Sequence, residues 1–212
     1  MKKIFRITQK DRLALCRQAP EFEEIARQTD LQPFPCDEDL FPALVQSIVS
    51  QQLAVKAADA IFRRVTDLLE ELTAERLLAA DSAALRTCGL SGRKIEYLRG
   101  IAEARISGRI DFDSLPAKSD AEVIRELVKL KGVGVWTAEM LLIFALGRPD
   151  ILSYSDLGIR RGIMMLNHLD TLTETEFEFY RRRYSPYGTL ASLYLWRIKD
   201  GGLLCGPAGK KD

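Results

Sequence analysis

The sequence has few of the features that stabilise secreted or membrane proteins. Its four cysteines stand alone, with no C-x-x-C pair, which predicts free thiols in a reducing compartment rather than a disulfide framework. No apolar run approaches the roughly 18 residues that cross a bilayer. The first residues, MKKIFRITQKDR, lack the apolar core and cleavage site of a signal peptide. We therefore expect a cytoplasmic protein (nucleoid-associated if bacterial) with no membrane partner.

The sequence also lacks a large excess of charge. With 31 basic and 30 acidic side chains its formal net charge is +1, which excludes a binder that relies on a global basic field. A local basic face remains compatible with this balance. The 212 residues, 47% hydrophobic and 29% charged, suffice for one globular domain or two small lobes. The single histidine, His168, lies far from the motifs below, so we expect it to be structural or exposed.

The hydrophobic residues follow a helical period. Apolar positions recur at spacings of three and four in residues 41–52 and 57–69, and again on either side of residues 131–134. A helix from Asp11 to Thr29 is also expected, followed by a linker at residues 32–35 that its two prolines keep from being helical throughout. No stretch alternates with period two over a useful length. The sequence therefore predicts an all-α protein with essentially no sheet.

A glycine-rich turn separates two of the predicted helices. It reads LKGVGVWTA from Leu130, and Gly132 and Gly134 stand one residue apart. Glycines let the backbone turn tightly and approach another molecule, and the amides that start the next helix favour an anion. One interpretation is a helical hairpin that clamps phosphate. The other is a plain helix–turn–helix corner that binds nothing, and the Gly-x-Gly pattern does not choose between them.

Several polar residues predict helix starts. Ser119 with Glu122 and Thr173 with Glu176 have capping-box spacing. Asp156 precedes an apolar helical run, so its local sequence is typical of a helix N-cap. A carboxylate at a helix start can also serve chemistry, and the two roles are compatible.

Four ordered motifs, within about residues 35 to 200, resemble the helix-hairpin-helix DNA glycosylases and most closely the 3-methyladenine DNA glycosylase II branch. They are the hairpin LKGVGVWTA, the later SDLGIRRG that contains Asp156, the earlier SQQLAVKAA, and the C-terminal pair SPY and LYLWR. The resemblance implies an all-α fold of two lobes with the active-site cleft between them. We expect an N-terminal helix and linker (1–40), a helical bundle (41–118), a hairpin lobe with a closing helix (119–200) and a flexible tail (201–212).

The resemblance implies a hydrolase that removes N-alkylated purines, such as 3-methyladenine and 7-methylguanine, from double-stranded DNA and so starts base excision repair. We expect it to act as a monomer. Asp156 would be the catalytic carboxylate. Trp136, Tyr187 and Tyr154 would line the base pocket, although a tryptophan at a helix start is commonly just core. Trp136 stands where bifunctional relatives carry a nucleophilic lysine, so a monofunctional enzyme without lyase activity is expected.

The resemblance also implies the DNA contacts and the cofactors. The DNA-binding residues would be Gln51, Gln52, Leu53, Lys131, Gly132, Gly134 and Thr137. Both glutamines are expected to face outward, with Gln52 filling the gap left by a flipped nucleotide. The alternative is an ordinary polar turn between helices. The carbonyls of Val128, Leu130 and Val133 would bind a monovalent cation, Na⁺ or K⁺. No iron–sulfur cluster is expected, because the clustered C-terminal cysteines of the endonuclease III branch are missing.

The chain departs from the branch pattern at two positions: the first, in the pocket motif, concerns the substrate range, and the second removes a side-chain contribution at the SQQLAVKAA turn. Gly188 follows Tyr187 where the family usually has arginine, and Ala54 replaces a serine or histidine. Two other functions stay open at this point. One is a glycosylase of the same fold that acts on mismatched, deaminated or oxidised bases, and the other is a hairpin DNA-binding module without catalysis.

Overall fold

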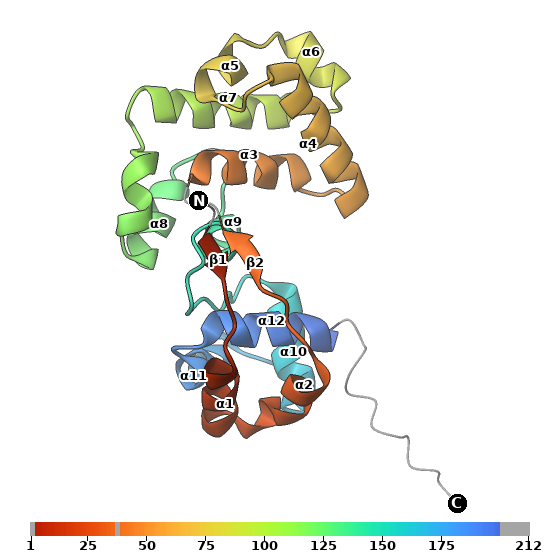
Figure 1. The fold of residues 1–212 in the computed structure, drawn as a ribbon, viewed down its shortest axis with the longest axis vertical. Coiled ribbons are helices and arrows are strands. Elements are labelled where there is room, and N and C mark those ends of the chain that lie inside the picture. Colours follow the sequence, from red (N-terminus) through yellow and green to blue (C-terminus); the bar gives the residue numbers. More distant parts are fainter. Residues whose placement is uncertain (1–2, 37–38, 200–212) are drawn as a thin grey trace, which may run out of the picture. The chain divides into compact units, whose positions relative to one another are not determined.

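The computed structural model describes residues 3–36 and 39–199, which form two compact units (Figure 1). Unit 1 combines residues 3–36 with residues 147–199, and unit 2 comprises residues 39–146. The expected all-α architecture is confirmed, since helices dominate both units. The expected tail at 201–212 lies outside the described residues.

Unit 1 holds the two ends of the described chain in one core. Its N-terminal part contains β1 (Lys3–Phe5), α1 (Gln9–Gln18), a short 3-10 helix (Pro20–Phe22), α2 (Glu23–Gln28) and β2 (Phe34–Cys36). Its C-terminal part contains α10 (Leu157–Leu166), α11 (Glu174–Tyr184) and α12 (Gly188–Lys199), and α12 lies along α10 (Figure 1). The Phe22 ring meets the Tyr184 ring edge-on with centroids 4.9 Å apart. The N-terminal segment is thus part of this core rather than a separate region.

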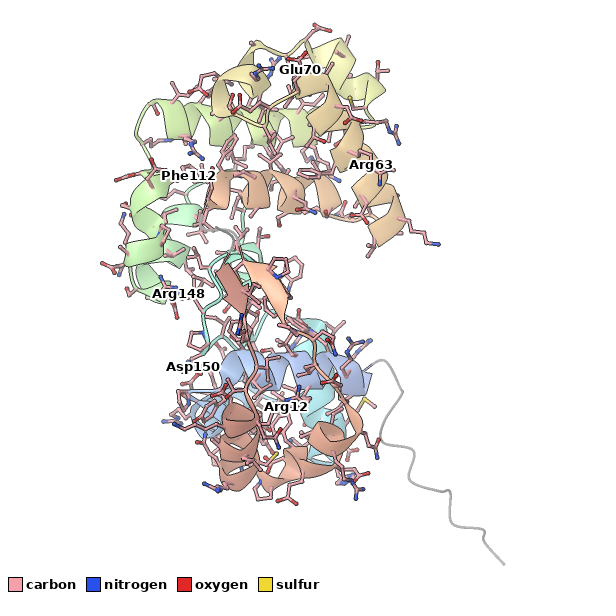
Figure 2. All side chains as sticks on the ribbon, in the orientation of Figure 1. Arg12, Arg63, Glu70, Phe112, Arg148 and Asp150 are labelled. Carbon is pink, nitrogen blue, oxygen red and sulfur yellow. The ribbon has the colours of Figure 1, made fainter. Side chains whose placement is uncertain are left out.

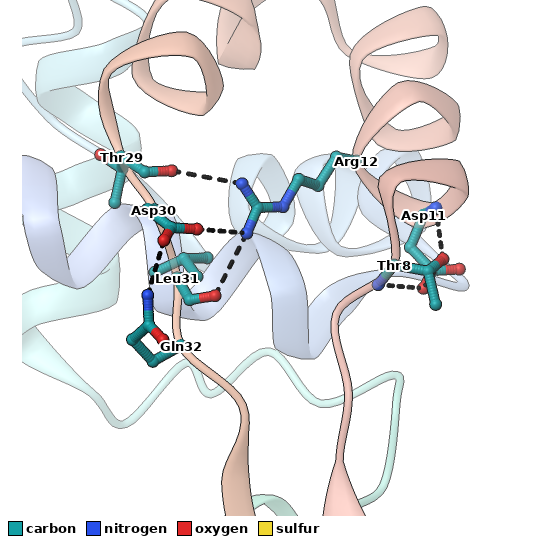
Figure 3. A network of polar contacts seen from close by, with 7 residues as sticks. All are labelled: Thr8, Asp11, Arg12, Thr29, Asp30, Leu31 and Gln32. Atoms are coloured by element: carbon teal, nitrogen blue, oxygen red, sulfur yellow. Dashed lines mark hydrogen bonds and ion pairs between the residues drawn. The ribbon is translucent and has the colours of Figure 1, made fainter.

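Polar contacts fix the N-terminal segment of unit 1 (Figure 3). The Arg12 guanidinium donates to the Leu31 carbonyl at 3.1 Å and to the Asp30 carboxylate at 3.2 Å. Thr8 and Asp11 form a capping box at the start of α1. The expected single helix from Asp11 to Thr29 is wrong. It breaks after Gln18, because Pro20 cannot donate the backbone hydrogen bond that a continuous helix needs.

The only pairing of strands in the described residues is antiparallel, between β1 and β2, in the register Lys3 with Cys36 and Phe5 with Phe34. The expected linker at residues 32–35 therefore ends in a strand. Pro35 is tolerated there because this ribbon has only two strands, so each has an edge where no ladder donor is required. The Phe5 and Phe34 rings stack with centroids 5.0 Å apart, which explains the pairing of such short segments.

Unit 2 is built around α3 (Leu40–Ser50), which packs against α4 (Val55–Leu69), α7 (Gly92–Ile106), α9 (Val135–Phe144) and a 3-10 helix (Phe112–Ala117). The remaining helices are α5 (Ala74–Ala79), α6 (Ser82–Thr87) and α8 (Asp120–Leu127). The apolar stripe of α3 is fully buried. Arg105 of α7 lies over the Phe41 and Phe112 rings, at 5.1 and 5.8 Å from their centroids.

The two units do not follow the expected domain boundaries. The predicted boundary between residues 118 and 119 falls inside unit 2, because α8 packs on α9 and α9 packs on α3. The hairpin therefore belongs with the helical bundle. The predicted N-terminal region 1–40 is likewise divided, since residues 3–36 share the core of α10, α11 and α12 while α3 belongs to unit 2.

Candidate functional site

Asp156 is the N-cap of α10, and its carboxylate is held by two donors. Oδ1 accepts the backbone N–H of Ile159 at 2.8 Å and the indole N–H of Trp196 at 3.1 Å. The residue is 8% exposed. The predicted cap is confirmed. A carboxylate bound by two donors within a buried setting keeps one orientation, which a group that must face developing charge requires.

The sequence reasoning missed Trp196 as a partner of Asp156. It lies in α12, forty residues from Asp156 along the chain, and α12 packs directly on α10. Gly162 makes this approach possible, because a Cβ there would come within 2.6 Å of the Leu195 carbonyl oxygen. The LYLWR motif contains the tryptophan, but nothing in the local pattern indicates what it binds.

The hairpin of α8 and α9 forms the turn that the Gly-x-Gly motif indicates. Gly132 adopts φ +87°, and a Cβ there would lie 2.2 Å from a ring carbon of Tyr97. Gly134 is the N-cap of α9 and offers no side-chain hydrogen bond to the amides that follow. The Val135 and Trp136 side chains are 47% and 42% exposed. The first amides of α9 thus begin a helix at an exposed surface, an arrangement that suits an anion.

The other predicted hairpin residues differ in exposure. Thr137 is only 4% exposed as a whole residue, and its contact with DNA stays a prediction. Lys131 is exposed and pairs with Glu96 of α7, and this hydrogen bond raises the pKa of Lys131 above its ordinary value. Its ammonium group stays charged at the surface beside the turn.

The turn between α3 and α4 carries Gln52, the residue predicted to enter the duplex as a wedge in the gap left by a flipped nucleotide. The expectation that both glutamines face outward is wrong for Gln51. Its side-chain amide donates to the Gly132 carbonyl at 2.9 Å, because the hairpin lies within reach of the end of α3. Gln52 and Leu53 are exposed, and Gln52 has a left-handed backbone with φ 59°.

The predicted cation ligands lie in the turn between α8 and α9. Val128 ends α8, where unpaired carbonyls carry partial negative charge. The Leu130 carbonyl accepts the Val133 amide at 3.1 Å, which uses one of its two lone pairs. The binding of a monovalent cation by the carbonyls of Val128, Leu130 and Val133 stays a prediction.

The two tyrosines predicted for the base pocket lie in unit 1. Tyr187 is half-buried and lines a pocket of about 300 Å³ with mostly apolar neighbours: Phe5, Arg6, Ile7, Asp11, Pro149, Pro186 and Leu190. The Tyr154 ring packs edge-on against Phe177 at 5.1 Å, and the Arg160 guanidinium covers it at 5.2 Å. Packing thus engages Tyr154 on two sides, and its role in a base pocket stays a prediction.

Asp150 explains why glycine stands at position 188. Its carboxylate accepts the Gly188 amide at 3.0 Å and the Ser185 hydroxyl at 2.5 Å, where the chain enters α12 (Figure 2). A Cβ at position 188 would lie 2.8 Å from the Asp150 carboxylate and 3.1 Å from the Ile151 nitrogen. The arginine that the family pattern has at this position would not fit here. Glycine at position 188 is therefore required by the structure of this chain.

The predicted residues are divided between the units. The hairpin, Trp136 and the Gln51–Gln52 turn belong to unit 2, whereas Asp156, Tyr154 and Tyr187 belong to unit 1. His168 is exposed, as expected, with φ 53°. Within residues 3–36 and 39–199, no cluster of three or more histidine, cysteine or acidic side chains could hold a metal ion. No helix of that part is long and apolar enough to span a membrane.

This combination of hairpin and capped carboxylate defines a class of base excision repair proteins. Residues 45–186 match the HhH-GPD superfamily of base excision DNA repair proteins, and the chain belongs to this family. DNA-3-methyladenine glycosylase 1 of Schizosaccharomyces pombe is 38% identical over 162 residues, which cover 74% of this chain and 71% of that protein. The family indicated by the sequence motifs is confirmed.

Two solved structures resemble the whole fold. A DNA-3-methyladenine glycosidase from Bacillus halodurans is 36% identical with a TM-score of 0.80, and the match covers 93% of this chain and 92% of that one. A 3-methyladenine DNA glycosylase from Schizosaccharomyces pombe, solved in complex with abasic DNA, is 32% identical with a TM-score of 0.78. That match covers 91% of this chain and 97% of the other.

Proposed function

We propose that this protein is a monofunctional DNA glycosylase that hydrolyses the N-glycosidic bond of N-alkylated purines in double-stranded DNA and so begins base excision repair. Bases of the 3-methyladenine and 7-methylguanine type are the substrates. The observation that carries the proposal is the Asp156 carboxylate, fixed by Ile159 and Trp196 in a chain of this repair family. The similar proteins named as 3-methyladenine glycosylases support the substrate class.

The reaction needs a fixed negative charge beside the sugar. As the bond from C1′ to the base nitrogen breaks, the base takes the bonding electron pair and positive charge develops on C1′ and the ring oxygen. The carboxylate of Asp156 stabilises this charge and orients the water that attacks C1′. The water gives one proton to the Asp156 carboxylate, which returns it to solvent, and the products are an abasic sugar and a free base. A purine methylated at N3 or N7 carries positive charge and leaves as a neutral base, so it needs little acid catalysis.

The DNA is held by the hairpin. The amides of Gly134 and the first turn of α9 bind a phosphate of one strand without reading its sequence. The carbonyls of Val128, Leu130 and Val133 would hold a monovalent cation, which would supply positive charge near the bound phosphate. Trp136 is exposed next to this turn, and its electron-rich ring suits a cationic purine. Trp136 has no amine to attack C1′, so no Schiff base forms and the strand is left intact.

The experiment compares wild type with Asp156→Asn on methylated duplex DNA and identifies the free bases released. We expect wild type to release 3-methyladenine and 7-methylguanine, and Asp156→Asn to bind the DNA but release at least about a hundredfold less. Borohydride is added in a parallel reaction, where no covalent protein–DNA adduct is expected. Equal release by both proteins would overturn the role of Asp156. Binding without release from a broad panel of lesions would favour a non-catalytic DNA-binding module, and a trapped lysine adduct would contradict the monofunctional assignment.

A further inference from the structure

Lys94 of α7 binds the end of α3, directly before the exposed Gln52 turn. Its ammonium group donates to the Val49 carbonyl at 2.7 Å and to the Gln51 carbonyl at 2.8 Å. The last carbonyls of a helix lack intrahelical partners and carry partial negative charge, so a cation there both satisfies and stabilises them. Burial lowers the pKa of Lys94 below its ordinary value, and the two carbonyl acceptors offset part of that cost.

The same helix also supports the hairpin. Tyr97, one turn after Lys94, packs beneath Gly132 so closely that no side chain fits there. The Gln51 amide then joins the turn to the hairpin through the Gly132 carbonyl at 2.9 Å. Two residues of α7 thus fix the end of α3 and the hairpin turn to one rigid helix, and Gln51 links them to each other.

Gln52 follows these contacts in a conformation that needs support. Its φ of 59° is uncommon for a residue other than glycine, and such backbones persist where the surrounding structure holds them. The Gln51 and Lys94 contacts hold the residue before it, and the Leu53 amide donates to the Ser50 carbonyl at 3.2 Å across it. Both Gln52 and Leu53, which is 40% exposed, project from a turn that is fixed at its start.

We propose that Lys94 is a positioning residue for base flipping, which with Gln51 holds the turn against the hairpin so that Gln52 can enter the duplex in place of the displaced nucleotide. This inference rests on the proposed glycosylase function. If the turn were mobile, Gln52 would lose conformational entropy on entering the DNA, and binding would be weaker. A turn that is already fixed to the phosphate-binding hairpin avoids most of this cost. Lysine suits the role because its ammonium group offers several donors to neighbouring carbonyls.

The proposal predicts a defect that depends on the substrate. Displacing a base from the stack costs least when the base is already unpaired. A variant with a loose wedge should therefore be slow on a paired lesion and much less affected when the lesion lies opposite an abasic-site analogue. Loss of folded protein would instead slow both substrates by the same factor.

The test measures single-turnover release of 7-methylguanine from these two duplexes by wild type and Lys94→Met. Because a hydrogen bond from a charged donor contributes about 1.5–3 kcal/mol, we expect the variant to be about tenfold or more slower on the paired lesion. On the unpaired lesion we expect less than about a threefold change. Lys10→Met, on the exposed surface of α1, makes the same change in net charge and should behave as wild type. Lys94→Arg should recover part of the rate.

A double-mutant cycle decides whether Lys94 acts through the wedge. In a Gln52→Ala background the wedge is already lost, so adding Lys94→Met should cost little more on the paired lesion. Equal losses on both duplexes, or fully additive losses in the cycle, would overturn the proposal. If Lys94→Met does not fold, Gln51→Leu replaces it, since that variant removes the link to Gly132 and keeps Lys94.

Failure of the proposed function would give a different result. In that case wild type would release no base from either duplex. The positioning of the turn is then tested by 2-aminopurine fluorescence, which rises when the probe base unstacks on protein binding. Wild type should raise the signal and Lys94→Met should raise it less at equal DNA occupancy. Equal signals from the two proteins would overturn the role of Lys94 independently of any chemistry.

Discussion

Asp156 uses a single carboxylate oxygen to begin a helix and to bind an indole. The Ile159 amide makes the first contact and the Trp196 ring nitrogen the second. The cap alone would leave the carboxylate free to rotate about its own bond to the chain. Trp196, on a helix that packs against α10, adds a second donor that restricts this rotation.

Trp196→Phe keeps an aromatic ring and removes the indole N–H. We expect slower base release with unchanged DNA affinity, because the carboxylate loses one of the donors that orient it. A hydrogen bond to a charged group contributes about 1.5–3 kcal/mol, so the single-turnover rate should fall by about tenfold or more. Rates at saturating enzyme, with fluorescence anisotropy for affinity, check this. A rate equal to that of wild type would show that the indole contact does not orient Asp156.

The sequence was sufficient to predict the capping position of Asp156 but not its partner Trp196. The capping position of Asp156 is a local signal, and its interval from the hairpin follows a family motif. The contact with Trp196 arises only when α12 packs on α10, which the chain order does not reveal. Lys94 and Asp150 were missed for the same reason, since each binds backbone atoms 38 to 45 residues away.

At the scale of helices and strands, local polar signals predicted the helix starts well. Both expected capping boxes, Ser119 with Glu122 and Thr173 with Glu176, are present. The box of Thr8 and Asp11 was not expected, because aspartate takes the place of the usual glutamate or glutamine. The strands β1 and β2 were missed because three residues are too few to display alternation.

The capping box at the start of α8 predicts a pH-dependent stability. The hydroxyl and backbone amide of Ser119 donate to Glu122 and lower its pKa below the ordinary 4.5. This contribution is therefore present above 4.5 and is lost as the pH falls through the lowered pKa of the folded state. Ser119→Ala should lower the urea midpoint of unfolding at neutral pH, and the difference from wild type should shrink in acid.

Ser91→Ala is the matched control for that measurement. Ser91 caps α7: its hydroxyl accepts the backbone N–H of Lys94. No carboxylate takes part in this cap. Its loss should lower the midpoint by an amount that does not change across the acid range. If the two variants show the same pH profile, the reciprocal bond from Ser119 does not stabilise the helix.

At the scale of the whole molecule, the chain places its candidate groups in two separate units. The expected domain boundaries differ from these units because they assumed that neighbouring segments pack together. Residues 3–36 share a core with residues 147–199, and aromatic contacts such as Phe22 with Tyr184 join segments far apart in the chain. Pairings of that kind depend on side-chain packing, which a hydrophobic period does not encode.

This division predicts that DNA binding and chemistry can be impaired separately. Gly134→Ala adds a methyl group where no atom lies within 4 Å and where φ is ordinary, so unit 2 should fold with it. A phosphate bound to the first amides of α9 would clash with that methyl group and lose one charge-assisted hydrogen bond. The Kd for DNA should therefore rise by about tenfold. The rate at saturating enzyme should stay near that of wild type.

Asp156→Asn, in unit 1, should show the opposite pattern: an unchanged Kd and a rate at least about a hundredfold lower. Gly100→Ala, in the middle of α7, is the control for an added methyl group, since its Cβ position is equally open, and it should bind DNA normally. Anisotropy titrations and single-turnover kinetics on one duplex compare all three variants. Full DNA affinity in Gly134→Ala would mean that no phosphate approaches the start of α9. The hairpin would then be a helix–turn–helix corner that does not bind DNA. Asp156 could still act on DNA that other residues hold.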